Sequence, residues 1–254
     1  MKIIINGING AMGQTILKTL VQFKDIEIVA GIDKMSNTDY PFPVFSDISL
    51  CDIKADAIID FSRPDALEGL LEYAKTTQTP LLIATTGLSD EQMHKIEVYS
   101  KDVALFFSAN MSLGVNLQMN LIAKAASLLY PDFEIEIIEK HHNKKVDAPS
   151  GTAFALADSI NNALDNKLKY VHGRHSKHEK REVNELGIHA IRGGTIVGEH
   201  SVMFIGRDEV IEINHIATSK QVFAIGAIRA AIFLNGKKPG LYSMKDLVAE
   251  MADK

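Results

Sequence analysis

The first 108 residues alternate short apolar runs with amphipathic segments, and this alternation constrains the fold more than any other feature of the chain. The apolar runs predict strands at Lys2–Asn6, Glu27–Asp33, Ala57–Asp60, Leu81–Ala84 and Val103–Ser108. The segments between them predict helices near Ala11–Gln22, Pro64–Thr76 and Ser89–Ser100. Strands that alternate with helices through short connections form βαβ units, so we expect a parallel sheet covered by helices.

The pattern changes after residue 111. Helices are predicted at Ser112–Leu129, from about Ser150, and at Gln221–Leu234. Strands are predicted at Phe133–His141, Ile188–Arg192, His200–Ile205 and Glu209–Ile216, and the polar stretch Asn161–Asn184 is interpreted as a surface loop. Consecutive strands joined by glycine-rich turns indicate an open mixed or antiparallel sheet. The expected fold class is therefore α/β, with a Rossmann-type domain followed by an α+β domain.

A glycine loop follows the first strand directly. Its glycines, Gly7, Gly10 and Gly13, have the spacing G-x-x-G-x-x-G, a variant of the dinucleotide fingerprint. Such a loop needs a tight turn, a bare backbone that approaches the pyrophosphate, and a helix N-terminus that faces the phosphates. The motif alone is weak, but its position between a strand and a helix strengthens it. The alternative is a set of turn glycines in another α/β fold.

Asp33 stands twenty residues after Gly13, at the end of the next predicted strand. An acid at that place is expected to bind the ribose hydroxyls of a dinucleotide. Lys34 follows it, and a cation there can meet a 2′-phosphate. The pair leaves the choice between NADH and NADPH open, and the alternative is that both are solvated surface charges.

The segment Glu139–Ala153 is rich in cations and contains His141, His142 and Lys145. It leaves a strand and enters a helix through Pro-Ser-Gly-Thr, and such a helix start presents free N–H groups to an anion. Histidine titrates near neutrality. The segment is therefore interpreted as a site that holds a carboxylate or phosphate and supplies a proton, with a charged surface turn as the alternative.

Other function classes find little support. The net charge of −5 argues against general nucleic-acid binding. The single cysteine, Cys51, excludes a cysteine zinc site within one chain and favours a reducing, cytoplasmic setting. His172, His175 and His178 lie in the polar stretch and are interpreted as solvated, so no metal is expected. The N-terminal apolar stretch Ile3–Ile5 is too short for a signal-peptide core, and the longest mostly apolar segment, Val222–Leu234, is shorter than a membrane span, so no membrane association is expected.

Over nearly its whole length the sequence resembles the dihydrodipicolinate reductase family of lysine and diaminopimelate biosynthesis. The most specific strings are EKHHNKKVDAPSGTA at Glu139–Ala153 and RGGTIVGEH at Arg192–His200. Shorter matches are Asp60–Ser62, Ala84–Gly87 and Ser108–Met111. The resemblance implies hydride transfer from NADH or NADPH to the cyclic imine that forms from 4-hydroxy-tetrahydrodipicolinate with loss of water, giving tetrahydrodipicolinate. The expected partner is thus a small dicarboxylate.

The resemblance also implies roles for individual residues. His141 and Lys145 match the family's catalytic residues, and His142, Gly151 and Thr152 match its substrate contacts. The cofactor-binding positions are Gly7, Ile8, Asn9, Gly10, Ala11, Met12, Asp33, Lys34, Ala84, Thr85, Thr86, Ser108, Ala109, Asn110 and Met111. Two departures stand out: Ala11 replaces a frequent cation, and Ala84 replaces a usual glycine.

The resemblance further implies two domains and a homotetramer. Residues 1–111, completed by 217–254, are expected to bind the dinucleotide, and residues 112–216 are expected to bind substrate and to mediate oligomerisation. Two rival functions remain: another dehydrogenase of amino-acid metabolism on the same fold, and a non-catalytic dinucleotide sensor. A sensor would keep the glycine loop but would not need His141 and Lys145 near a cleft.

Overall fold

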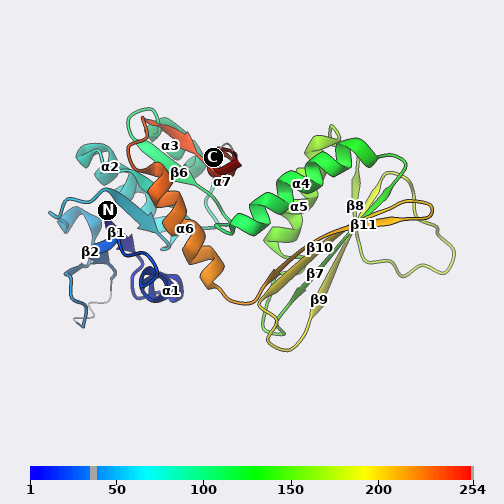
Figure 1. Ribbon diagram of the computed structural model, residues 1–254, viewed down its shortest axis with the longest axis horizontal. Coiled ribbons are helices and arrows are strands. Elements are labelled where there is room, and N and C mark those ends of the chain that lie inside the picture. The colour runs from blue at the N-terminus through cyan, green and yellow to red at the C-terminus, as the bar shows by residue number, and fades with distance from the viewer. Residues whose placement is uncertain (35–38, 253–254) are drawn as a thin grey trace. The chain divides into compact units, whose positions relative to one another are not determined.

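The computed structural model describes residues 1–34 and 39–252 and shows two compact units (Figure 1). The first unit comprises Met1–Leu113 together with the chain from Lys220 onward. The second unit comprises Gly114–Ser219. Each unit has its own sheet and its own hydrophobic core.

Seven parallel strands form the sheet of the first unit, in the order β12-β6-β5-β4-β1-β2-β3. They are β1 (Lys2–Asn6), β2 (Glu27–Ile32), β3 (Val44–Phe45), β4 (Ala57–Asp60), β5 (Leu81–Ile83), β6 (Ala104–Phe107) and β12 (Gly240–Tyr242). The strand order reverses beside β1, which pairs with β2 on one side and with β4 on the other. Ligands of open parallel sheets bind at the carboxyl ends of the strands next to such a switch point.

Helices cover both faces of this sheet. They are α1 (Ala11–Leu20), α2 (Leu67–Thr77), α3 (Asp90–Tyr99), α6 (Gln221–Leu234) and α7 (Met244–Ala252), with short 3₁₀ turns at Ile48–Leu50 and Pro64–Ala66. Ile3 and Ile5 belong to the core formed with α1, α6 and α7, whereas Ile4 belongs to the core formed with α2 and α3. Successive residues of a strand face opposite ways, which is why a run of isoleucines fills both cores.

The second unit contains a five-stranded mixed sheet in the order β11-β10-β7-β9-β8. Its elements are α4 (Leu113–Leu129), β7 (Glu134–His141), α5 (Gly151–Ala163), β8 (Lys169–His172), β9 (Glu185–Arg192), β10 (Gly198–Ile205) and β11 (Val210–Ala217). Strand β10 is antiparallel to its neighbours, while β9 is parallel to both β7 and β8. Both helices contribute to the core with Ile135, Ile137, Val202 and Phe204 of the sheet.

Strand β7 carries a buried carboxylate, Glu136, between the core residues Ile135 and Ile137 in the sequence. Glu136 is 9% exposed, and its Oε1 accepts hydrogen bonds from Arg174 Nη2 (2.7 Å) and Arg181 Nε (3.1 Å). Its Oε2 lies 2.7 Å from His189 Nε2. Burial alone would raise the pKa of Glu136, but His189, Arg174 and Arg181 together lower it. Gly187 leaves room for this carboxylate, because a Cβ at that position would overlap Glu136 Oε2.

The structure corrects the interpretation of Asn161–Asn184 as a loop. Helix α5 continues to Ala163, and Lys169–His172 forms strand β8. This strand has four residues at the edge of the sheet and is held by parallel pairing with β9. An edge strand of this length carries little hydrophobic periodicity, so backbone pairing with β9 rather than a local pattern determines it.

Three further elements were not predicted: β3, β12 and α7. The two strands have two and three residues, too few for a period of two to be recognised. A signal for α7 was present, because the N–H and the hydroxyl of Ser243 donate to Asp246 Oδ2 at 2.8 and 2.7 Å. Serine followed three residues later by an acid is a typical helix start.

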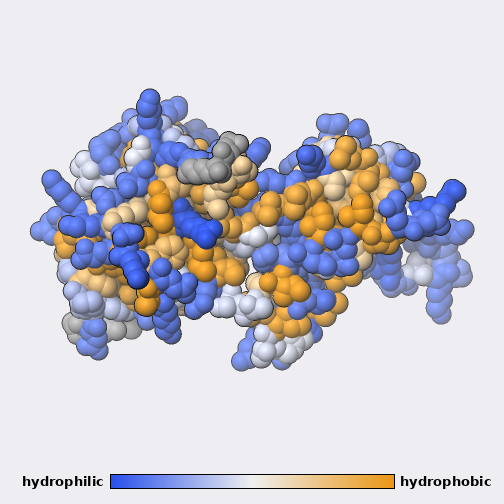
Figure 2. Space-filling view, in the orientation of Figure 1, coloured by the Kyte–Doolittle hydropathy of each residue, from blue (hydrophilic) through white to orange (hydrophobic). Residues whose placement is uncertain are grey.

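Exposed apolar side chains lie on α4. Leu117, Leu121 and Leu128 are all exposed, and Figure 2 shows apolar atoms gathered over this part of the second unit.

None of the helices among the described residues combines the length and the hydropathy that crossing a bilayer requires.

Candidate functional site

The glycine loop joins β1 to α1 through backbone that leaves no room for side chains. Gly7 has φ +81°, and a Cβ there would lie 2.8 Å from the Phe61 carbonyl oxygen. Gly10 is the N-cap of α1, and a Cβ on Gly13 would overlap the carbonyl oxygens of Gly7 and Ile8. The first turn of α1 therefore packs directly on the loop, and the helix N-terminus follows the carboxyl end of β1.

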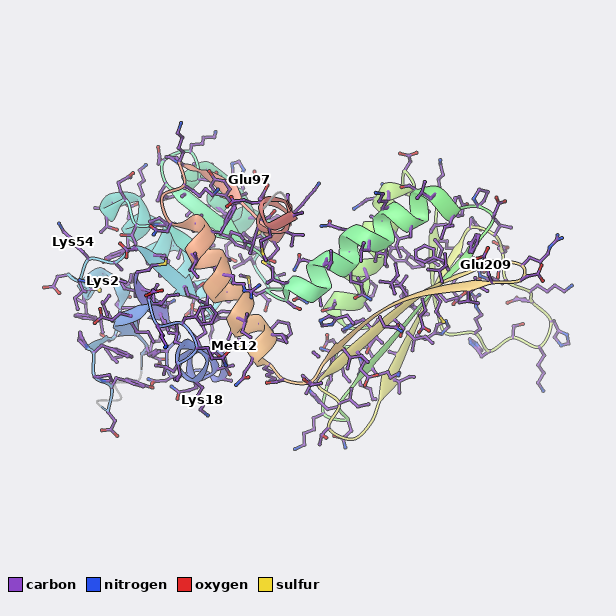
Figure 3. The ribbon with its side chains drawn as sticks, in the orientation of Figure 1. Lys2, Met12, Lys18, Lys54, Glu97 and Glu209 are labelled. Carbon is purple, nitrogen blue, oxygen red and sulfur yellow. The ribbon has the colours of Figure 1, made fainter. Side chains whose placement is uncertain are left out.

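The remaining loop residues have different exposures. Ile8 is fully buried and Ala11 is exposed. Met12 lies in the first turn of α1 (Figure 3), and its side chain is half-buried. Asn9 Oδ1 accepts a hydrogen bond of 2.8 Å from the Tyr40 hydroxyl. Ile8 therefore belongs to the hydrophobic core, and the Asn9 side chain connects the loop to Tyr40.

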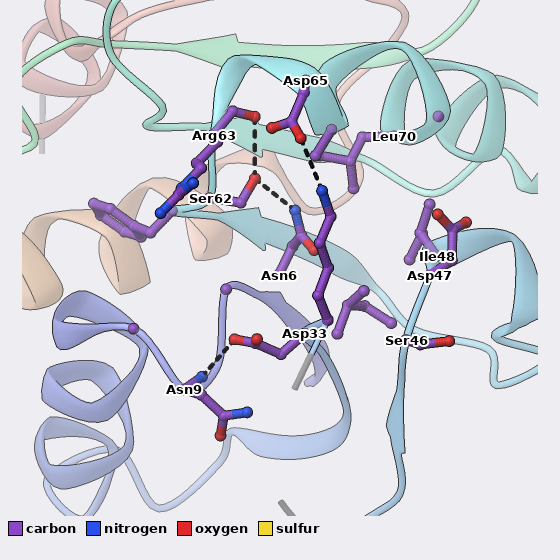
Figure 4. A pocket seen from close by; sticks show the side chains of 17 residues that line it. Asn6, Asn9, Asp33, Ser46, Asp47, Ile48, Ser62, Arg63, Asp65 and Leu70 are labelled. Carbon is purple, nitrogen blue, oxygen red and sulfur yellow. Dashed lines mark hydrogen bonds and ion pairs between the residues drawn. The ribbon is translucent and has the colours of Figure 1, made fainter. Parts of the chain in front are cut away.

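Asp33 lies immediately after β2 and faces the glycine loop. Its Oδ2 accepts a hydrogen bond of 3.0 Å from the Asn9 N–H. Lys34 Nζ points to Asp65 Oδ2 at 2.8 Å, and both side chains of that pair are exposed (Figure 4). The acid is thus held at the loop, whereas the neighbouring cation is engaged by a carboxylate of the turn before α2.

These residues line a cavity of about 630 Å³ at the carboxyl edge of the sheet (Figure 4). Its walls include Gly7, Asn9, Gly10, Asp33 and Lys34, five of the predicted cofactor positions. Arg63 also lines it and is exposed. The volume falls within the range of small-molecule and cofactor sites. Sequence reasoning did not single out Arg63, although it directly follows the quoted string Asp60–Ser62.

A buried carboxylate connects three strand ends beside this cavity. Asp60 is 1% exposed, and its Oδ1 accepts from Asn6 Nδ2 (2.8 Å) and from the hydroxyl (2.6 Å) and N–H (3.0 Å) of Ser62. Its Oδ2 accepts a 2.8 Å hydrogen bond from the Thr85 hydroxyl. Burial raises the pKa of Asp60 despite these hydrogen bonds. Its position at the carboxyl end of a central strand was the sequence signal for this role.

The predicted nicotinamide-side residues lie at the ends of β5 and β6. Ala84 and Thr85 are buried, whereas Thr86 is exposed. The Ser108 hydroxyl donates to the Asn110 carbonyl at 2.8 Å, which closes a tight turn that also contains the exposed Ala109. Met111 is buried, and a Cβ on Gly226 would overlap its carbonyl oxygen. Helix α6 therefore packs directly against this turn.

In the second unit, the histidine segment begins where β7 ends. His141 is the last residue of the strand and is buried, and His142 is half-buried. The Lys145 N–H donates to the His142 carbonyl at 3.1 Å, which forms a tight turn. Lys145 Nζ lies 2.8 Å from Asp147 Oδ1, and this ammonium lowers the pKa of Asp147. The predicted proton-transfer residues thus lie at the end of β7 and in the turn that follows it.

Helix α5 follows this turn after the cis Ala148–Pro149 peptide bond. The Ser150 hydroxyl caps the helix by accepting a hydrogen bond of 3.2 Å from the Ala153 N–H. Gly151 and Thr152, two predicted substrate contacts, form its first turn, and Gly151 is exposed. Accessible N–H groups at such a helix start can hold a carboxylate.

The structure adds two residues to the candidate site that sequence reasoning did not single out, Glu139 and Arg192. Glu139 is fully buried, and its Oε2 lies 2.7 Å from His141 Nδ1. Arg192 forms two hydrogen bonds of 2.7 Å with the Glu139 carboxylate. A signal was present, because strand alternation places Glu139 on the same face as the core residues Ile135 and Ile137.

His200 packs edge-on against His141, with 5.1 Å between ring centroids. Burial is the main cause that lowers the pKa of His200 to about 4, and the nearby His141, His215 and Lys145 lower it further. A histidine that is neutral when folded stabilises the protein above its unfolded-state pKa of 6.5, and this contribution is lost as the pH falls toward 4.

We therefore expect His200→Gln to reduce the acid sensitivity of the folded state. Between pH 6.5 and 4, His200 should account for about 3 kcal/mol of the fall in the free energy of unfolding. Urea unfolding at both pH values measures this slope, with the exposed His178→Gln as the control. An unchanged slope in His200→Gln would show that the ring does not titrate in this way.

Comparisons with known proteins agree with this geometry. Residues 1–111 match the family described as dihydrodipicolinate reductase, N-terminus, and residues 114–248 match its C-terminus. The 4-hydroxy-tetrahydrodipicolinate reductase of Clostridium novyi is 49% identical over 97% of this chain and 98% of its own length. That of Caldanaerobacter subterraneus is 51% identical over 98% of both chains.

A solved structure supports the fold. The dipicolinate-bound dihydrodipicolinate reductase from Paenisporosarcina sp. TG-14 superimposes with a TM-score of 0.82 at 24% identity, covering 97% of this chain and 98% of that one. The α/β fold with a parallel and a mixed sheet and the family resemblance are thus both confirmed. The chain belongs to the dihydrodipicolinate reductase family, whose members are also named 4-hydroxy-tetrahydrodipicolinate reductases.

Proposed function

We propose that this chain reduces the cyclic imine derived from 4-hydroxy-tetrahydrodipicolinate, with residues of its two units in separate roles. Family membership makes it an oxidoreductase that uses NADH or NADPH. The observation that carries the substrate assignment is the combination of His141, Lys145 and a capped helix start within one short segment. A dicarboxylate suits such a set, because cations and helix N–H groups bind carboxylates.

The first unit is proposed to hold the cofactor. The bare backbone at Gly7 and Gly13 suits a pyrophosphate, and Asp33 at the loop suits ribose hydroxyls. The nicotinamide ring supplies the hydride when bound. Thr85, Thr86 and the turn Ser108–Met111 are proposed to line the ring's side of the site, and Asp60 keeps the strand ends around Thr85 in place.

The second unit is proposed to bind the substrate and to move the proton. Hydride addition to the unsaturated imine leaves an electron-rich enamine, which must take up one proton. Lys145 is proposed to supply it, and His141 is proposed to assist as a proton donor or acceptor, while His142, Gly151 and Thr152 hold a carboxylate. The Asp147 carboxylate, 2.8 Å from Lys145 Nζ, orients the ammonium.

The direct test is NADH oxidation by the purified protein with freshly formed dihydrodipicolinate. The expected result is oxidation that requires the dicarboxylate. Tight NADH binding without turnover on this or on homoserine-type and aspartate-type substrates would instead favour a dinucleotide sensor.

For cofactor choice, we expect NADH to be at least as good as NADPH. Asp33 repels a 2′-phosphate, Ala11 brings no cation, and Lys34 is engaged by Asp65. Asp65→Asn should free Lys34 and improve the KM for NADPH about threefold, since a solvent-exposed ion pair is weak and its loss has a small effect. KM values for both cofactors at one ionic strength measure this.

The matched control for cofactor choice is Asp102→Asn, which breaks the exposed Lys75–Asp102 pair of 2.9 Å. Neither residue lines the cavity, so the ratio of the two KM values should not change. A wild-type preference for NADPH above about tenfold, equal to about 1.4 kcal/mol, would contradict the assignment.

We also propose that the chain forms a homotetramer through its second unit, as the family resemblance implies. Val210, Ile211 and Ile216 are exposed on the edge strand β11 and provide apolar surface for association. Sedimentation at micromolar concentration tests this, and a monomer throughout would contradict it.

A further inference from the structure

The Glu139 carboxylate is buried at a position where strand alternation places apolar side chains. Its side chain has no exposed surface, and it lies on the face of β7 that carries Ile135 and Ile137. A buried carboxylate destabilises a fold unless its oxygens are hydrogen-bonded. The contacts of each oxygen therefore indicate what the group does.

Both oxygens of Glu139 accept two hydrogen bonds. Oε1 accepts from the Ser150 N–H at 2.9 Å and from Arg192 Nη2 at 2.7 Å. Oε2 accepts from Arg192 Nη1 at 2.7 Å and lies 2.7 Å from His141 Nδ1. A carboxylate offers about four lone-pair positions, so these four contacts use them all.

This arrangement determines the tautomer of His141. Burial alone would raise the pKa of Glu139, but hydrogen bonds from Arg192, His141 and Ser150 lower it below its ordinary value. An ionised carboxylate only accepts hydrogen bonds, so Nδ1 of His141 carries the proton. The lone pair of the neutral ring is then on Nε2.

The surroundings of Nε2 leave it accessible to small groups. A Cβ on Gly198 would lie 3.1 Å from His141 Nε2 and 3.9 Å from His200 Cε1. The Nε2 of His200 is itself engaged by a contact of 3.1 Å with the Ser150 hydroxyl. Glycine at position 198 therefore keeps the space beside Nε2 open.

Arg192 extends the same network to the lysine turn. Its Nη2 also donates to the Asp147 carbonyl at 2.5 Å, and Asp147 pairs with Lys145 Nζ. Pairing of β7 with β9 sets Arg192 opposite His141, so the sheet itself brings the guanidinium to Glu139. The buried Glu139–Arg192 ion pair thus contacts His141 directly and is connected to Lys145 through Asp147.

We infer that Glu139 and Arg192 are positioning residues: they hold His141 with its proton on Nδ1 and its Nε2 free for proton transfer, and they fix the turn that carries Lys145. The inference deepens the proposed function and rests on it for the role of His141. No bond is made or broken at Glu139 or Arg192.

The test uses Glu139→Gln in the full-length protein. Glutamine has one acceptor oxygen and an NH₂ group, so it cannot accept from Ser150, Arg192 and His141 together. We expect kcat to fall by about 10²-fold, as when an orienting carboxylate is lost, with the Kd for NADH unchanged. Glu139→Asp keeps the carboxylate and should recover part of kcat.

A spectroscopic measurement separates positioning from general damage. Nitrogen-15 NMR of histidine-labelled protein distinguishes ring tautomers, and the His141 signals are identified by their loss in His141→Gln. We expect protonation on Nδ1 in the wild type and a shift toward protonation on Nε2 in Glu139→Gln. A wild-type ring protonated on Nε2 would overturn the inference.

The matched control is Glu136→Gln, which changes another buried carboxylate of β7 that is bonded to two arginines and a histidine. It should lose stability but keep kcat and the His141 tautomer. Equal losses of kcat in Glu136→Gln and Glu139→Gln would show a purely structural role and overturn the inference.

Two further outcomes have defined meanings. If Glu139→Gln fails to fold, Arg192→Lys is tested in place of Glu139→Gln. Lysine keeps the positive charge but cannot bond both carboxylate oxygens in one plane. An unchanged kcat and an unchanged His141 tautomer in Arg192→Lys would overturn the inference. If His141→Gln retains full kcat, His141 does not have the proposed role in proton transfer. The His141 tautomer in the wild type and in Glu139→Gln still tests whether Glu139 positions the ring.

Discussion

Lys145→Met is expected to lower kcat by about 10²- to 10⁴-fold, the range for loss of a general acid. Methionine keeps much of the length of the side chain but has no proton to give, and it releases Asp147 from its 2.8 Å ion pair with Lys145. The Kd for NADH should not change, because the proposed pyrophosphate site is the glycine loop of the first unit. Steady-state kinetics and NADH titration measure both quantities.

The neighbouring histidines serve as comparisons for Lys145→Met. His141→Gln should also lower kcat, because this ring is proposed to share the proton transfer. His142→Gln should raise KM and leave kcat near its starting value, since a residue that holds a carboxylate equally in ground and transition states affects binding alone. A near-normal kcat in Lys145→Met would show that the segment Glu139–Ala153 only binds an anion and does not supply the proton. Loss of NADH binding in all three variants would indicate a damaged fold.

The second large effect is expected for Gly13→Ala. A Cβ there would overlap the carbonyl oxygens of Gly7 and Ile8, which belong to the backbone of the loop. Helix α1 must then move away from the loop, at an expected loss of about 1–3 kcal/mol in the free energy of unfolding. NADH affinity should fall at least tenfold because the loop and the helix start shift together.

Gly69→Ala is the matched control for Gly13→Ala. It also lies inside a helix of the first unit, but a Cβ there would approach only Ile48 Cγ2, at 3.8 Å. Alanine in an unstrained helix position should stabilise the fold by about 0.5–1 kcal/mol. Chemical unfolding without cofactor compares the two variants, and a Gly13→Ala protein as stable as the wild type would contradict the close packing described here.

Local patterns in the sequence were enough to predict the first unit in outline. Strands of this sheet carry continuous apolar runs, and the helices between them carry a period near 3.6, so both are visible within short windows. The glycine loop and Asp33 follow from the same βαβ pattern, and the cavity wall contains both. The string at Glu139–Ala153 was specific enough to indicate the family, which the comparisons confirm. The roles of its individual residues stay predictions.

The tertiary structure alone decided which distant residues support the site. Glu139 and Arg192 are 53 residues apart, and they meet because β7 pairs in parallel with β9 in one register. Asp60 likewise joins Asn6 and Thr85 only because their strands are neighbours. Hydrophobic periods and capping residues report interactions within a few positions, whereas strand order and register are determined by packing across the whole unit. The sequence by itself therefore determined the fold class, the glycine loop and the family, and the tertiary structure determined the buried charge network around His141.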